Sequence, residues 1–136
     1  MKALIVGCGR VGSSLAKKLQ GSGWDVSVVD SSEDSLVRLG ENWPGEFHVG
    51  HGMDIAVLEG AGIESADAVI VATSGDNTNI VVSQVAKERY GIESVAVRLL
   101  DPARAEFYAT KGLHVVSPTR DAINGLATWA LEGRPD

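Results

Sequence analysis

The feature that most constrains the fold of this chain is a glycine-rich turn close to its start. Residues 7–12 read Gly-Cys-Gly-Arg-Val-Gly, which is the spacing Gly-x-Gly-x-x-Gly. The turn follows a short apolar run at residues 2–6, and it precedes residues 11–20, whose apolar side chains share one helical face. A strand, a glycine-rich turn and a helix in this order form the phosphate-binding unit of Rossmann-type folds. The context therefore gives weight to a motif that would be weak evidence alone.

Each part of this turn has an expected role. Gly7 permits the sharp turn, Gly9 lets a diphosphate approach the backbone, and Gly12 lets the helix pack closely against the strand. The helix that begins near Val11 offers unpaired N–H groups and a partial positive charge to an anion. Arg10 either pairs with a phosphate or faces the solvent, and the sequence favours neither. Cys8 is better explained as a small packed residue than as a redox group.

An acidic residue stands where a ribose would be recognised. Asp30 closes an apolar run at residues 25–30 and lies 18 residues after Gly12. A carboxylate at this place accepts hydrogen bonds from the ribose hydroxyls and disfavours a 2′-phosphate. We therefore expect NAD(H) or ATP/ADP rather than NADP, and we include the adjoining Ser31 in the predicted site.

The rest of the chain alternates between strand and helix patterns. Further strands are expected at residues 47–49, 68–72, 94–98 and 114–116, and further helices at 32–39, 54–58, 77–90, 102–110 and 117–131. Short connections between alternating elements favour a parallel sheet with helices on both sides. We predict an α/β fold in one domain, residues 1–136. It is a Rossmann-type, doubly wound, parallel six-stranded sheet with strand order 3-2-1-4-5-6 and a C-terminal helix.

The turn after the third strand should lie at the same edge of the sheet as the glycine-rich turn. Gly52 allows close approach of a ligand, and Met53 is positioned to lie against an adenine ring. Asp54 is included in the site, although its better explanation is the N-cap of a helix. His51 either contacts a phosphate or is simply solvated.

The turns after the fourth and fifth strands complete the predicted site. Small and hydroxyl-bearing residues border the nucleotide after the fourth strand: Ala72, Thr73 and Ser74. Asp76 and Asn77 either border it too or cap the long helix. Arg98 ends the fifth strand, where it reaches a phosphate or a neighbouring subunit, or else pairs with Asp101 or Glu106.

Composition excludes several classes of protein. The net charge of −6 argues against a nucleic-acid-binding protein, which normally shows a basic face. The single cysteine allows no internal disulfide. The apolar run at the start of the chain is too short for a signal peptide, and no run approaches the length of a membrane span. We therefore expect a soluble, cytoplasmic protein without direct membrane insertion.

The sequence contains no recognisable set of catalytic residues. The histidines at 48, 51 and 114 lack the spacing of metal ligands, so no metal site is predicted. Tyr108 and Lys111 are three residues apart, whereas short-chain dehydrogenases place such a pair four apart. A binding fold without a proton-transfer group suggests a sensor and not an enzyme. The alternatives are the cofactor-binding half of an NAD-dependent oxidoreductase and a structural module that has lost its ligand.

An ordered series of short motifs adds a family resemblance. It runs through residues 2–12, 29–30, 50–54, 61–63, 66–68, 72–73, 79–80, 86–87, 97–98 and 112–118. The series resembles the nucleotide-binding N-terminal domain, called KTN, RCK or TrkA-N, of Trk/Ktr-type potassium-uptake regulatory proteins. His51 departs from the family, which often has aspartate there. The C-terminal ligand-binding domain often attached in this family is also missing, so we expect either part of a longer protein or a short stand-alone subunit.

The resemblance implies a function and partners. It implies a cytoplasmic regulatory subunit that binds NAD(H) or ATP/ADP and gates a membrane potassium transporter through a conformational change. Such a subunit lies peripheral to the inner face of the cell membrane through its partner. The family also implies a homodimer or a ring of dimers.

The last expected helix gives an indication of assembly that does not depend on the family resemblance. Its apolar residues form a stripe at helical spacing, with a tryptophan beside it: Ile123, Leu126, Ala127, Trp129, Ala130 and Leu131. The stripe is either ordinary core packing or a surface for a partner. Its position at the end of the chain favours assembly through this helix.

Overall fold

The computed structural model describes residues 1–134 and contains one six-stranded parallel sheet with the order β3-β2-β1-β4-β5-β6. The strands are β1 (Lys2–Val6), β2 (Asp25–Asp30), β3 (Glu46–Val49), β4 (Ala68–Val71), β5 (Ser94–Arg98) and β6 (His114–Val116). The predicted fold class and strand order are confirmed. Residues 135 and 136, which the predicted domain included, lie outside the described residues.

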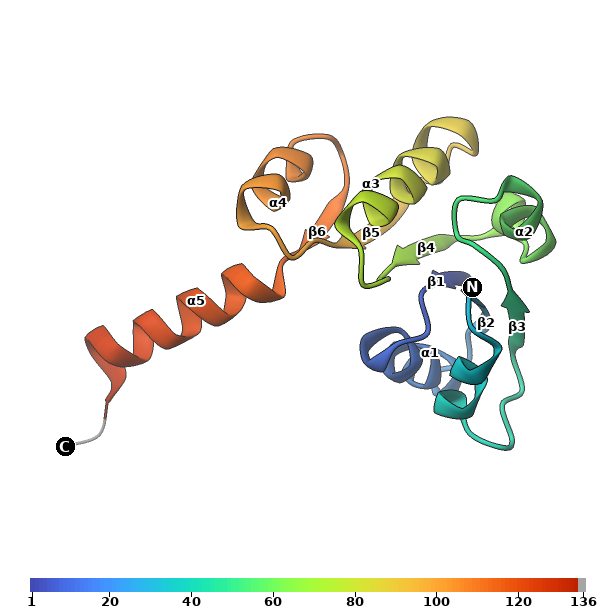
Figure 1. Ribbon diagram of the computed structural model, residues 1–136, viewed down its shortest axis with the longest axis horizontal. Helices are drawn as coiled ribbons and strands as arrows, with labels where there is room; N and C mark the ends of the chain where they lie inside the picture. Colours follow the sequence, from blue (N-terminus) through green and yellow to red (C-terminus); the bar gives the residue numbers. More distant parts are fainter. Residues whose placement is uncertain (135–136) are drawn as a thin grey trace.

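The helices follow the strands in alternation (Figure 1). They are α1 (Arg10–Gly21), the 3-10 helix η1 (Glu33–Leu39), α2 (Ile55–Gly60), the 3-10 turn η2 (Ile63–Ser65), α3 (Asp76–Gln84), α4 (Pro102–Ala109) and α5 (Pro118–Thr128). Two π-helical segments extend α3 and α5: η3 (Val85–Arg89) and η4 (Trp129–Gly133). Within residues 1–134, no helix combines the length and the hydropathy needed to cross a bilayer.

The core lies on both faces of the central strand β1. Leu4 and Val6 pack into a large cluster that includes Leu58 of α2 and Val82 of α3. Ile5, on the opposite face, packs with residues of α1 and η1 in a smaller cluster. Because successive side chains of a strand point to opposite faces, the continuous apolar run of β1 serves both clusters.

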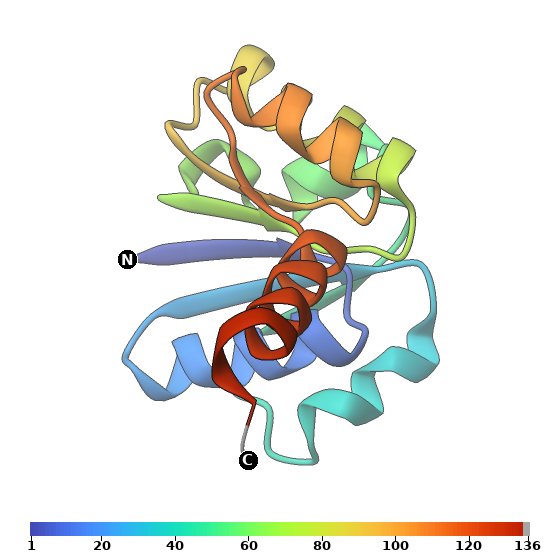
Figure 2. The same ribbon diagram turned by 90° about the vertical axis from the view of Figure 1, so that its left-hand side faces the viewer.

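The helices cover the two halves of the sheet unequally. Figures 1 and 2 show α1 and η1 beside the β1–β3 half, and α3 and α4 beside the β4–β6 half. Val95 and Val97 of β5 are buried beneath α3 and α4. On the other face, Ile70, Ala96 and His114 line an open hollow of about 280 Å³. Parallel sheets are normally covered on both faces, so this face of the sheet is unusual.

One helix type and several helix boundaries differ from the sequence-based expectation. Residues Glu33–Leu39 form a 3-10 helix, and the Asp30 carboxylate accepts hydrogen bonds from Ser32 N and Ser35 Oγ, which tie the segment to the end of β2. The long helix begins at Asp76 and not at Asn77.

Helix α5 projects away from the body of the domain (Figure 1). Its Ser117 N-cap is buried, but within residues 1–134 no side chain of α5 or η4 is buried. The exposed fraction is 71% for Leu126 and 55% for Trp129. Core packing is therefore the wrong explanation of the apolar stripe in this chain.

Candidate functional site

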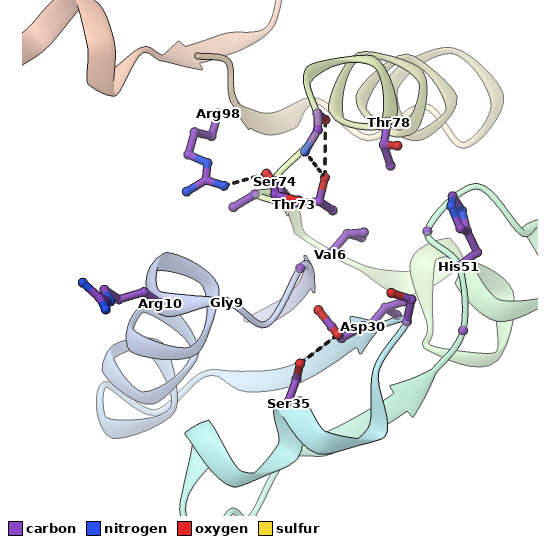
Figure 3. Close-up of a pocket in the computed structure, with 17 residues that line it drawn as sticks. Val6, Gly9, Arg10, Asp30, Ser35, His51, Thr73, Ser74, Thr78 and Arg98 are labelled. Atoms are coloured by element: carbon purple, nitrogen blue, oxygen red, sulfur yellow. Dashed lines mark hydrogen bonds between the residues drawn. The ribbon is translucent and has the colours of Figure 1, made fainter.

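A cavity of about 560 Å³ opens at the carboxyl edge of the sheet (Figure 3). This volume lies within the usual range for small-molecule and cofactor sites. The cavity is lined by the ends of β1, β2 and β5 and by the turns that follow β1, β2, β3 and β4. Ten of the fourteen predicted site residues line it: Gly7, Gly9, Arg10, Asp30, Ser31, Gly52, Ala72, Thr73, Ser74 and Arg98.

The three glycines of the first turn are subject to different steric constraints. Gly7 has φ +108, and a Cβ placed there would lie 2.6 Å from the Ala72 carbonyl oxygen. A Cβ at Gly12 would collide with the Gly7 carbonyl oxygen. Both positions therefore exclude a side chain because backbone passes close by. At Gly9, by contrast, an added Cβ would have no heavy atom of residues 1–134 within 4 Å apart from those of the adjoining backbone.

Gly9 is also the N-cap of α1. The first hydrogen bond of the helix runs from Ser13 N to Gly9 O at 3.0 Å, so the preceding N–H groups have no partner within the helix. These groups and the helix dipole favour an anion at the floor of the cavity. Arg10 is exposed at the mouth, on the same side as Arg98 in Figure 3.

Asp30 holds the glycine-rich turn as well as facing the cavity. Its Oδ1 accepts from Cys8 N at 2.9 Å, and its Oδ2 accepts from Ser32 N and Ser35 Oγ, each at 2.9 Å. A carboxylate oxygen has room for two donors, so Oδ1 retains one acceptor position for a ligand hydroxyl. The bond to the turn was not anticipated from the sequence, which assigned Asp30 to the ribose alone.

Cys8 is fully buried behind the turn. Burial, followed by the nearby negative charge of Asp30, raises the pKa of its thiol. A thiol held in this way is a poor nucleophile, as the small-packed-residue explanation requires.

Only part of the turn after β3 lines the cavity as expected. Gly50 and His51 line the cavity with Gly52, whereas Met53 and Asp54 lie outside it. Met53 is 46% exposed, and Asp54 Oδ1 accepts from Ala56 N as the N-cap of α2. The adenine contact expected of Met53 stays a prediction. His51 Nδ1 accepts from Met53 N at 3.2 Å and thereby shapes the turn.

The turn after β4 is tied to the end of β5 by one buried amide. Asn79, 1% exposed, accepts from Thr73 N and Thr73 Oγ1 and donates to Thr73 O at 3.1 Å and Arg98 O at 2.8 Å. Arg98 Nη2 also donates to Thr73 O, at 2.6 Å. The ion pair considered for Arg98 with Asp101 or Glu106 is therefore replaced by a contact inside the site.

Asp76 and Asn77 do not cap the long helix. The N-cap is Gly75, and the Asp76 carboxylate accepts from Leu100 N at 2.8 Å and Asp101 N at 3.0 Å. Asn77 Oδ1 accepts from Arg104 Nη2 of α4. Both side chains therefore link α3 to the segment that follows β5.

Several lining residues were missed by sequence reasoning: Val6, Val29, Ser35, Gly75 and Thr78. Val6 and Val29 end strands whose carboxyl edge was already identified, so their position was a recoverable signal. Ser35 and Thr78 lie on η1 and α3, and only the packing of those helices brings them to the cavity. Val11 and Gly12, both predicted, belong to α1 and lie outside the lining.

The fold and the site together define a Rossmann-type domain with a glycine-rich turn and a carboxylate at the carboxyl edge of the sheet. The family model of the TrkA-N domain matches residues 3–118. The chain belongs to the TrkA-N domain family.

Individual relatives agree with this assignment. The chain is 45% identical over 120 residues to the Trk system potassium uptake protein TrkA of Streptomyces coelicolor, covering 88% of this chain and 54% of that protein. Among solved structures, the TrkA-N domain of the Escherichia coli inner membrane protein ybaL is similar, with a TM-score of 0.83, 23% identity and 96% of each chain covered. A Shewanella denitrificans Kef CTD in AMP-bound form has a TM-score of 0.81 and 22% identity, covering 96% of this chain and 80% of that one.

The chain spans about half the length of the curated TrkA relative. The similarity of the two solved structures, at 22–23% identity, concerns the fold.

Proposed function

We propose that this domain binds an adenine nucleotide, NAD(H) or ATP/ADP, and acts as a nucleotide-sensing regulatory domain of a potassium transporter. The observation that carries the binding proposal is the cavity between Gly9 and Asp30. It places an open backbone turn at a helix N-terminus opposite a carboxylate with a remaining acceptor position. The AMP-bound state of the similar Kef CTD supports a nucleotide as the ligand.

In this proposal each part of the nucleotide has a place. The diphosphate lies over Gly9 and the first turn of α1, and a ribose hydroxyl donates to Asp30 Oδ1. Arg10 and Arg98 stand at the side of the cavity where a third phosphate would extend (Figure 3). A guanidinium binds a phosphate strongly, so these two residues would distinguish ATP from ADP. Val11 supplies backbone at the helix start, and Met53, exposed next to the lining residue Gly52, is assigned to the adenine ring.

The regulatory role rests on the family and on the chemistry of the site. The cavity is lined mainly by glycines, hydroxyl-bearing residues and two arginines, which suit binding more than proton transfer. The TrkA relative belongs to a potassium uptake system. A nucleotide would gate the membrane partner by binding one conformation of the domain more tightly than another. The domain would then lie at the cytoplasmic side of the membrane through that partner.

Assembly is the second part of the proposal. The apolar stripe of α5 has exposed residues that cost free energy in water, and the β4–β6 half of the sheet leaves one face open. A homodimer in which α5 of each copy covers apolar surface of the other would remove both costs. A ring of dimers is a further arrangement of the same unit.

Isothermal titration calorimetry with AMP, ADP, ATP, NAD and NADH tests the binding proposal. We expect at least one nucleotide to bind with a Kd below the millimolar range. Asp30→Ala should weaken that affinity about 10- to 100-fold, since hydrogen bonds to a charged group contribute ~1.5–3 kcal/mol. Asp34→Ala on η1 removes the same charge outside the cavity and should leave the affinity unchanged.

The outcomes separate the alternatives. An absence of binding by any of the five nucleotides would show a structural module without a ligand. Equal affinities for Asp30→Ala and Asp34→Ala would place the ligand elsewhere on the domain.

A further inference from the structure

The buried amide of Asn79 joins two residues of the site to each other and to the base of α5. Its side chain makes four hydrogen bonds, three to Thr73 and one to the Arg98 carbonyl oxygen. A primary amide offers two donor hydrogens and an oxygen with two acceptor positions, so all four capacities of Asn79 are used. Thr73 and Arg98 both line the cavity, whereas Asn79 itself does not.

The connection continues from Arg98 to α5. Leu99 N, the next amide along the chain, donates to Val116 O at 3.0 Å, and Arg98 is paired with Val116 between β5 and β6. Val116 is followed by Ser117, the fully buried N-cap of α5, whose Oγ accepts from Arg120 N. The carboxyl end of β5 is therefore fixed on one side by Asn79 and on the other by the strand that leads into α5.

A second side chain of α3 strengthens the same connection. The Asp76 carboxylate accepts from the Leu100 and Asp101 amides, immediately after β5. The N-terminal turn of α3 thus holds three consecutive peptide groups beyond Val97 through two side chains. A displacement of Thr73 would therefore reach these peptide groups through the direct hydrogen bonds of α3 side chains.

Arg98 supplies a reason for Thr73 to shift when the cavity is filled. Its guanidinium donates to Thr73 O through Nη2, and the same carbonyl accepts from Asn79 Nδ2. A phosphate competes with a neutral carbonyl for a guanidinium, because the charge-assisted hydrogen bond is stronger. A nucleotide that engages Arg98 would leave the Thr73 carbonyl oxygen bonded to Asn79 Nδ2 alone.

We propose that Asn79 is a positioning residue that sets Thr73 and Arg98 for the nucleotide and transmits occupancy of the cavity to the base of α5. The proposal rests on nucleotide binding at this cavity, as proposed above. It assigns to α3 the coupling between the ligand and the helix expected to mediate assembly.

Hydrogen–deuterium exchange followed by mass spectrometry tests the coupling in the intact chain, with and without saturating ADP. In the unsubstituted chain, ADP should slow exchange in residues 7–13 and also change exchange in residues 114–131. Asn79→Ala should weaken ADP affinity about tenfold, because Thr73 and Arg98 lose the hydrogen bonds that set their positions. At saturation it should keep the protection of residues 7–13 but lose the change in residues 114–131.

Two further variants make the result specific. Asn77→Ala makes the same chemical change two residues earlier, on the exposed side of α3, where the partner of Asn77 is Arg104, and should behave as the unsubstituted chain. Asp76→Ala removes the exposed hydrogen bonds to the Leu100 and Asp101 amides and leaves no cavity in the core. It should reduce the change in residues 114–131 even where Asn79→Ala fails to fold.

The possible contrary results are distinct. The coupling is overturned if ADP protects residues 7–13 but leaves 114–131 unchanged in the unsubstituted chain. It is equally overturned if the Asn79→Ala or Asp76→Ala variant retains the full change there. An absence of protection in residues 7–13 of the unsubstituted chain would overturn the binding proposal and, with it, this inference.

Discussion

Gly9 and Gly12 stand in one six-residue turn but face opposite environments. A Cβ at Gly12 would collide with the Gly7 carbonyl, so Gly12→Ala should lower the free energy of unfolding by about 3 kcal/mol. Gly9→Ala places its methyl group in open space and should change stability by less than about 1 kcal/mol. The same methyl group would stand where the diphosphate is proposed to lie, so Gly9→Ala should weaken nucleotide affinity at least tenfold.

Urea denaturation and calorimetry of the two variants measure these effects separately. A Gly9→Ala variant that binds nucleotide as tightly as the unsubstituted chain would contradict the proposed diphosphate position. The close packing at Gly12 was predictable from the motif and its place between a strand and a helix. The second role of Asp30 was not, because its hydrogen bond to Cys8 N depends on how the turn folds back over β2.

The buried thiol of Cys8 makes stability depend on pH in a defined direction. Its pKa is raised in the folded chain, so the folded state holds the proton more tightly than the unfolded state. This contribution is complete below the ordinary thiol pKa of 9.0 and is lost as the pH rises above it. We expect the urea concentration at the midpoint of unfolding to decrease as the pH is raised from about 9 to about 10. The decrease should be smaller in Cys8→Ala. Equal losses in both chains would show that Cys8 does not cause the dependence.

At the scale of secondary-structure elements, a substitution in α5 tests whether this exposed apolar helix mediates assembly. Leu126→Asp adds a charge to the centre of the stripe at a residue 71% exposed in the single chain. Monomer stability should change by less than about 0.5 kcal/mol, because the site touches little of its own domain. A homodimer held by this stripe should weaken at least about 30-fold, as expected for a central interface residue contributing ~2 kcal/mol.

Light scattering coupled to size-exclusion chromatography over a concentration series measures the association. Asn124→Asp adds the same charge to an exposed residue on a different side of α5 and should leave the association unchanged. Identical masses for both variants and the unsubstituted chain, at every concentration, would remove α5 from the proposed interface.

Elements with strong periodicity were predicted well, and their ends less well. The buried strands and their order follow from apolar runs separated by short connections. The 3-10 form of η1 was not predicted, because a helical pattern of apolar residues does not separate a short 3-10 helix from an α-helix. The network of Asn79 was not predicted either, because it depends on β5 lying beside α3.

At the scale of the whole molecule, one edge of the sheet brings together the parts of the proposed nucleotide site from four separate turns. Ten predicted residues meet there because parallel strands present their carboxyl ends together. Met53 and Asp54 show the limit of that argument. They follow a strand end at the correct edge, but capping of α2 turns Asp54 away from the cavity.

The most direct test of the proposed site is a titration of the ¹⁵N-labelled chain with ADP, followed by amide chemical shifts. The account predicts the largest changes at the amides of residues 9–11, 30–31 and 73–74, saturating with a single Kd below the millimolar range. Residues at the opposite, amino-terminal edge of the sheet, such as Asp25 and Ala66, should change little. The account would be contradicted by shifts that are absent at millimolar ADP, or that gather at that opposite edge instead of the glycine-rich turn.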